Sequence, residues 1–169
     1  MIKPWFSARL LLAPLFTCGM IVQLAAEQVD WGRYRHPVFG YEIDIPYTIF
    51  PPVGDDRDRL VFERPDGQSR LTIYGEDNVD RLPLSEIARE LEASPLVSKV
   101  TYRKLGKSWV VLSGHLTPAG AAEQIFYLKL MMSADRQRYA VFAINYPRSE
   151  KTRFDTIVDR LEASFRPPT

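Results

Sequence analysis

Apolar and polar residues alternate along the first well-patterned part of the chain, FGYEIDIP at residues 39–46. Alternation with a period of two is typical of a half-buried antiparallel strand, because successive side chains of a strand point to opposite faces. Pro46 lacks an amide hydrogen, so we expect the strand to span residues 39–45 and to end there. The Pro-, Gly- and Asp-rich residues that follow, through Asp56, predict a loop.

A β-hairpin is predicted by two alternating runs, residues 60–64 and 69–75, on either side of Asp66-Gly67. Asp-Gly between two such runs is a strong signal for a tight turn. With this dipeptide at the centre of the turn, Glu63 faces Arg70. The apolar residues of both strands then share one face, and the charged pair lies on the other.

Two segments, residues 84–93 and 150–164, have apolar residues at helical spacing. Side chains three and four positions apart lie on one side of a helix, so each segment predicts an amphipathic helix with one buried stripe. Pro95 follows the first segment, and Ser149, a preferred capping residue, precedes the second. The stripes are Leu84, Ile87, Ala88 and Leu91 in the first helix and Phe154, Ile157, Val158, Leu161 and Phe165 in the second.

Four further runs predict an antiparallel meander, because short turns join them: residues 97–104, 109–115, 124–132 and 139–146. The whole pattern predicts one α+β domain over residues 38–166. It consists of a mainly antiparallel sheet, which contains residues 39–45 with the hairpin and the meander, packed by two amphipathic helices that share one face or lie one on each face. Dinucleotide-binding and P-loop folds need strand–helix alternation and a glycine-rich loop, and the sequence has neither.

The order of these elements resembles the PsbP/Mog1-like family of small α/β/α sandwiches. The resemblance rests on the FGYEIDIP strand, the hairpin after it, the SEIAREL helix, the WVVLSG, FYLKL and YAVFAINYP strands and a closing helix that ends in SF. It implies a binding or assembly module, since members of that family act in photosystem assembly or bind a small GTPase. No functional residue of the family matches a residue of this chain, so none is carried over.

Residues 1–26 have the composition of a secretory signal peptide. Lys3 and Arg9 are the only charges before Glu27, an apolar stretch follows them, and Ala25-Ala26 are the small residues that signal peptidase needs. We expect removal of residues 1–26, a polar and aromatic N-terminal arm over residues 27–37, and a periplasmic or secreted protein without a stable membrane span. Two alternatives stay open. The leader remains as a membrane anchor, or Cys18 is acylated, although Thr17 is not the small residue expected before a lipoprotein cysteine.

Removal of the leader changes the charge and the cysteine count. The chain has 22 basic and 21 acidic residues, and loss of Lys3 and Arg9 leaves a net charge of about −1. No nucleic-acid partner is expected of such a chain. Cys18 is the single cysteine, so the mature chain has no thiol for nucleophilic, redox or metal chemistry, and its core alone must hold it together.

Acidic residues gather on either side of the predicted hairpin. The hairpin register, extended outward, places Asp56 opposite Asp77, so that six carboxylates meet at its open end. Clustered carboxylates suit a hard cation such as Ca²⁺, but the spacing is not that of an EF-hand, and interleaved arginines can neutralise the charges instead. We favour the metal-free interpretation. The six residues are Asp55, Asp56, Asp58, Glu76, Asp77 and Asp80.

Aromatic residues are frequent in the arm and in the loop after the first strand. Such side chains are enriched at recognition surfaces, and they also cap cores, so both interpretations are kept. His36 and His115 lack metal-binding spacing, and Ser113-Gly114-His115 lacks the strand-to-helix turn of a nucleophile elbow. No catalytic residue, metal or cofactor is therefore predicted. The candidate partner surface is Trp31, Tyr34, Phe39, Tyr47 and Phe50.

The sequence thus favours an exported, non-enzymatic binding or assembly module whose partner is a protein or another envelope component. The alternative is a small envelope enzyme whose site is assembled from distant residues. A deep pocket with two or more carboxylates and no neutralising arginine would favour the enzyme. A flat surface with an exposed aromatic patch would favour the binding module.

Overall fold

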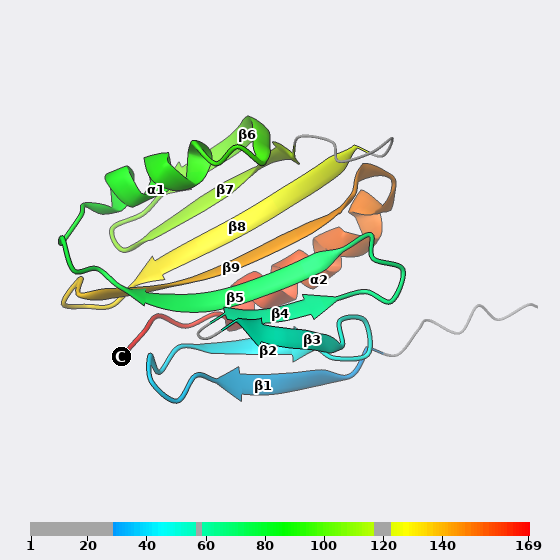
Figure 1. Ribbon diagram of the computed structural model, residues 1–169, viewed down its shortest axis with the longest axis horizontal. Coiled ribbons are helices and arrows are strands. Elements are labelled where there is room, and N and C mark those ends of the chain that lie inside the picture. The colour runs from blue at the N-terminus through cyan, green and yellow to red at the C-terminus, as the bar shows by residue number, and fades with distance from the viewer. Residues whose placement is uncertain (1–28, 57–58, 117–122) are drawn as a thin grey trace, which may run out of the picture.

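The computed structural model describes residues 29–56, 59–116 and 123–169, so the predicted leader and Asp58 lie outside the described residues. Figure 1 shows one large curved sheet with a helix on each side of it. The sheet has seven antiparallel strands in the order β3-β4-β5-β9-β8-β7-β6. The strands are β3 (Pro52–Asp56), β4 (Arg59–Glu63), β5 (Arg70–Asp77), β6 (Val97–Leu105), β7 (Trp109–Leu116), β8 (Gln124–Met132) and β9 (Arg138–Pro147).

The predicted hairpin and meander are confirmed. β4 pairs with β5 in the predicted register, with Glu63 opposite Arg70 and the Arg70 guanidinium 2.6 Å from the Glu63 carboxylate. Strands β6 to β9 pair in succession, each antiparallel to the next. The turn signals therefore identified the neighbouring strands correctly, because two strands joined by a short turn pair with each other and run antiparallel.

The two helices lie on opposite faces of the sheet, as a sandwich requires (Figure 1). Helix α1 (Leu84–Glu92) packs on one face, against Val110, Leu112 and Leu130 among others. Helix α2 (Lys151–Ser164) packs on the other, where its predicted apolar stripe is buried. A 3₁₀ turn, Arg148–Glu150, leads into α2 and contains Ser149, so the capping role expected for Ser149 is wrong: Glu150 holds the cap position without a side-chain hydrogen bond.

A separate two-stranded sheet lies beside α2. It pairs β1 (Trp31–Arg35) with β2 (Glu42–Pro46), so part of the predicted arm is a strand. The WGRYR sequence of β1 does not alternate cleanly, so its pattern did not predict a strand. Contacts with distant residues hold this strand in place. Arg33 Nε donates to Asp44 Oδ1 at 2.6 Å, and the Arg160 guanidinium lies 4.4 Å from the Trp31 ring. Local patterns carry no signal for such partners.

The placement of residues 39–45 in the main sheet is wrong, although their alternation is real. Tyr41, Ile43 and Ile45 are fully buried, but they pack across the α2-side core instead of extending the seven-stranded sheet. The predicted loop through Asp56 is wrong as well, since β3 forms an edge strand there. Pro52 is tolerated at its start because an edge strand has a side on which no amide donor is needed.

Among the described residues, no helix has the length and apolar character needed to cross a membrane.

Candidate functional site

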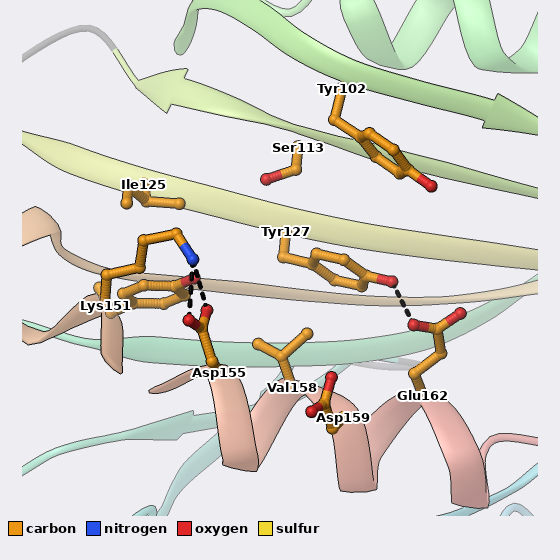
Figure 2. Close-up of a pocket in the computed structure, with 10 residues that line it drawn as sticks. Tyr102, Ser113, Ile125, Tyr127, Lys151, Asp155, Val158, Asp159 and Glu162 are labelled. Atoms are coloured by element: carbon orange, nitrogen blue, oxygen red, sulfur yellow. Dashed lines mark hydrogen bonds and ion pairs between the residues drawn. The ribbon is translucent and has the colours of Figure 1, made fainter. Parts of the chain in front are cut away.

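A groove of about 420 Å³ lies between α2 and the part of the sheet beside it (Figure 2). Helix α2 contacts β2, β8 and β9, and Tyr102 of β6 and Ser113 of β7 line the groove beside it. The groove therefore has the helix as one wall and strands as its floor. We call it the α2 groove; its lining residues are Tyr102, Ser113, Ile125, Tyr127, Tyr146, Lys151, Asp155, Val158, Asp159 and Glu162.

The helix wall carries three carboxylates. Asp155, Asp159 and Glu162 are spaced four and three residues apart, so they share one side of α2. Lys151 Nζ lies 2.8 Å from Asp155, one turn earlier on the same helix. Asp159 is exposed and takes no ion pair or hydrogen bond within the described residues, which leaves its charge available to a partner.

The floor is a row of hydroxyl side chains across three strands. The strand register aligns Tyr102 of β6 with Ser113 of β7, and Ser113 with Tyr127 of β8. Ser113 Oγ donates to the Phe126 carbonyl at 2.8 Å. Its hydroxyl proton is therefore engaged with the backbone, and His115, two residues away, instead places Nδ1 2.9 Å from Glu123. This is not the arrangement of an activated serine nucleophile.

Tyr127 and Glu162 join the floor to the wall. The Tyr127 hydroxyl donates to Glu162 Oε2 at 2.7 Å, as Figure 2 shows, and Lys129 Nζ lies 3.1 Å from Oε1 of the same carboxylate. Burial raises the pKa of Tyr127, and the hydrogen bond to Glu162 and its negative charge raise it further. Tyr127 is thus held as a neutral donor.

Glu162 is held as an anion. Burial by itself would raise the pKa of Glu162, but the hydrogen bonds from Tyr127 and Lys129, with the charges of Lys129 and Lys104, outweigh burial and lower that pKa. A general acid at neutral pH needs a carboxyl pKa that is raised. The groove thus presents fixed charges and fixed hydrogen-bonding groups, which suit binding better than proton transfer.

The strand register does not bring the described residues of the predicted acidic cluster together, and Asp58 lies outside the described residues. The chain reverses between β3 and β4, so Asp56 lies opposite Arg59, and the expected pairing of Asp56 with Asp77 is wrong. Asp77 lies opposite Arg138 of β9 instead, with 3.2 Å between Arg138 Nε and the carboxylate. The β4–β5 register is the predicted one over Arg59–Glu63. The alternating pattern, however, gave no signal for the reversal of the chain between β3 and β4.

The other acidic residues of this set lie apart. Glu76 accepts a hydrogen bond from Tyr139 and lies 3.1 Å from the Arg59 guanidinium. Asp55 belongs to β3, and Asp80 is exposed in the connection from β5 to α1. Across the part of the chain that the structure describes, no three His, Cys, Asp or Glu side chains are grouped as metal ligands.

The predicted aromatic surface divides between core and exterior. Phe39 and Phe50 are 8% and 0% exposed, so their assignment to a partner surface is wrong: they fill the α2-side core. Trp31 and Tyr34 are half-buried against the same core, and Tyr47 is exposed. Sequence reasoning missed the carboxylates of α2, because acidic residues on the outward side of an amphipathic helix are ordinary. Only the fold shows that this side lines the α2 groove.

A second hollow, of about 390 Å³, lies on the opposite face beyond the end of α1. Its lining is mostly apolar and includes Leu91, Leu96, Phe126 and Leu128, with Arg59 among the few polar residues. It offers apolar contact, whereas the α2 groove combines aromatic rings, hydroxyls and carboxylates. The groove is therefore the better-equipped recognition site of the two.

The fold and groove define a small α+β sandwich with a polar, aromatic cleft beside its C-terminal helix.

No family model and no curated protein sequence matches the chain. Solved structures do match it. The solution structure of cyanobacterial PsbP (CyanoP) from Synechocystis sp. PCC 6803 has a TM-score of 0.64 and 13% identity, over 92% of this chain and 99% of that one. The Ran-binding protein Mog1p of Saccharomyces cerevisiae has a TM-score of 0.56 and 10% identity, over 82% and 96% of the two chains.

The chain therefore has a PsbP/Mog1-like fold, which confirms the fold expected from the order of its elements. At these identities the similarity is one of fold, and it assigns no residue a function.

Proposed function

We propose that this chain is an exported, non-enzymatic binding module of the cell envelope, and that it binds a protein or another envelope component in the α2 groove. The observation that carries the proposal is the state of the groove side chains. Glu162 is held ionised by Tyr127 and Lys129, and Tyr127 is held neutral by burial and by Glu162, so the groove presents groups of fixed charge and fixed orientation to a partner. The similarity in fold to a protein named as Ran-binding supports a binding function.

The chemistry of the groove favours a partner that presents hydrogen-bond donors or positive charge. Among the described residues, three carboxylates line it against one cation, Lys151, and no arginine does. Tyr102 and Tyr127 add aromatic surface, which binds both aliphatic and cationic groups. Asp159 is the carboxylate most available to a basic side chain of a partner, because it is exposed and takes no ion pair or hydrogen bond among the described residues.

The alternative function, a small envelope enzyme, draws support from the same three carboxylates. Two of them, however, are neutralised by lysines: Asp155 by Lys151 and Glu162 by Lys129. The lowered pKa of Glu162 also removes it as a general acid near neutral pH. We therefore favour binding over catalysis.

Binding is tested with the tagged mature chain, residues 27–169, against an envelope extract. Asp159→Lys reverses the charge that faces the groove and leaves the core of α2 intact. Glu90→Lys, on the exposed side of α1, is the matched control on the opposite face. We expect the wild type and Glu90→Lys to capture the same partner and Asp159→Lys to lose it. Equal capture by all three chains would contradict the proposed site.

Export is tested separately by fractionation and N-terminal sequencing of the expressed protein. We expect the mature chain to begin at Glu27 and to be found outside the cytoplasm, because residues 10–26 carry no charge and end in Ala25-Ala26. An intact Met1 in the membrane fraction would identify the leader as an anchor instead.

A further inference from the structure

The outer edge of β6 is open. β6 is the last strand of the seven-stranded sheet and pairs with β7 alone within the described residues. Seven of its nine residues are exposed. Nine residues of strand extend about 30 Å, so this edge is long enough to receive a further strand.

Backbone hydrogen-bonding groups line this edge. The amide of Gly106 donates to the carbonyl of Trp109 at 2.8 Å and closes the β6–β7 turn as a hydrogen-bonded pair. Bonded and non-bonded pairs alternate along an antiparallel ladder. Counting back from Gly106, Arg103 and Leu105 occupy non-bonded positions, so their N–H and C=O groups point away from β7. These are the groups that an added strand uses.

The edge is also strongly basic. Residues 97–107 contain four basic residues and no acidic one: Lys99, Arg103, Lys104 and Lys107. Arg103 is neutralised by Glu92 of α1, with 2.6 Å between them. The three lysines take no ion pair within the described residues; Lys104 lies over the Trp109 ring at 5.7 Å. Within the described residues Lys99 and Lys107 are therefore two positive charges without an ion pair, and Lys104 adds a third that also acts on Glu162, in a chain whose net charge is close to zero.

These charges select the strand that can pair here. Lysines on an edge strand oppose pairing with a second copy of the same edge, because like charges would face each other across the new ladder. The same lysines favour a strand that carries carboxylates, so one feature excludes self-association and attracts an acidic partner. Register shifts lie between Val97 and Lys99 and between Val100 and Tyr102, which leaves residues 102–105 as the regular docking segment.

We propose that β6 accepts an acidic, extended segment of a partner protein as an eighth strand of the sheet. This inference rests on the proposed binding function and adds a second contact: the partner that presents donors or positive charge to the α2 groove presents an acidic segment to β6. Arg103 and Leu105 lie on the α1 face and Tyr102 and Lys104 on the groove face. The partner segment therefore carries carboxylates on the side that meets Lys99 and Lys104, and apolar residues on the side that meets Leu105, which is 45% exposed.

The test uses two labelled synthetic peptides, one of alternating Glu and Val residues and one with Lys in place of every Glu. Binding to the mature chain is followed by fluorescence anisotropy. We expect the Glu peptide to bind and the Lys peptide not to bind. The double variant Lys99→Glu with Lys104→Glu should weaken binding of the Glu peptide about tenfold or more. Glu86→Lys with Glu90→Lys, on α1, is the control that should leave its affinity within about twofold. A circular dichroism melt of each variant confirms folding.

Hydrogen exchange distinguishes strand addition from simple charge attraction. We expect the bound Glu peptide to slow exchange at the amides of Arg103 and Leu105, which the free protein leaves to solvent. Binding without this protection would overturn the proposal, and so would binding of anionic vesicles with no peptide bound.

Asp159→Lys leaves β6 intact, so loss of the envelope partner with unchanged peptide binding separates the groove from the edge. Failure of the peptide with partner capture retained would leave the binding function standing and refute the added strand.

Discussion

At the scale of single residues, the pair of Tyr127 and Glu162 controls the ionisation of the groove. Tyr127→Phe removes one donor to the Glu162 carboxylate and leaves Lys129 as its remaining partner. We expect the pKa of Glu162 to rise toward its ordinary value. Because Glu162 is partly exposed, we expect the free energy of unfolding at neutral pH to fall by only about 1 kcal/mol. Urea unfolding measures the stability, and an NMR titration of the Glu162 side chain measures the pKa.

The sign of the pH dependence follows from the lowered pKa of Glu162. A carboxyl with a lower pKa in the folded state stabilises the fold above its unfolded pKa, and this contribution is lost as the pH falls through the folded value. Tyr127→Phe should therefore reduce the loss of stability on acidification. Tyr102→Phe is the control, since its hydroxyl has no hydrogen bond within the described residues. An unchanged Glu162 titration in Tyr127→Phe would show that Lys129 alone sets the ionisation.

At the scale of elements, the attachment of β6 depends on one glycine. A Cβ at position 114 would collide with the carbonyl of Lys99 and with the Val100 backbone across the ladder. Backbone cannot move aside as a flexible side chain can, so Gly114→Ala should lower stability by about 1–3 kcal/mol. Amide exchange should accelerate most in β6. Gly54→Ala is the control, because nothing lies within 4 Å of the added methyl group, and its urea midpoint should stay unchanged.

Whether an element could be predicted depended on whether its signal is local in the sequence or comes from contacts with distant residues. The hairpin at Asp66-Gly67, the meander and the apolar stripe of α2 were predictable, because turn residues and periodicity are local signals. The strand β1 was not, because pairing with β2 and the contact of Arg160 with Trp31 come from distant parts of the chain. The groove was missed for the same reason: Tyr102, Tyr127 and Glu162 meet only after α2 has packed across the sheet.

At the scale of the whole molecule, two cores share one sheet. The core under α1 and the core under α2 are built from opposite faces of this sheet, and strands β5, β8 and β9 contribute buried residues to both. Loss of either layer therefore exposes one face of strands that the other layer also needs. This arrangement depends on the order and periodicity of the elements more than on particular residues. It therefore persists at 13% and 10% identity to the two solved structures, where no sequence match is found.

Buried tyrosines on both faces make the fold sensitive to alkaline pH. Burial, then the nearby charge of Glu76, raises the pKa of Tyr74 on the α1 side to about 12, although Arg59 opposes the shift. Burial, then the charge of Asp155, raises the pKa of Tyr146 on the α2 side to about 12. A group whose folded pKa is raised stabilises the fold fully below its unfolded pKa, here about 10. That contribution is lost as the pH rises from there through the folded pKa.

We therefore expect the folded protein to ionise only part of its eight tyrosines near pH 10 and to unfold in one cooperative step at higher pH. In denaturant all eight should titrate together near the ordinary pKa. Tyrosinate absorbance and far-ultraviolet circular dichroism, recorded on the same samples, measure ionisation and unfolding side by side. Because the two layers share the sheet, both signals should change together whichever face ionises first. Complete ionisation near pH 10 with an unchanged dichroism spectrum would mean that Tyr74 and Tyr146 reach solvent in the folded state and that their burial does not hold the layers together.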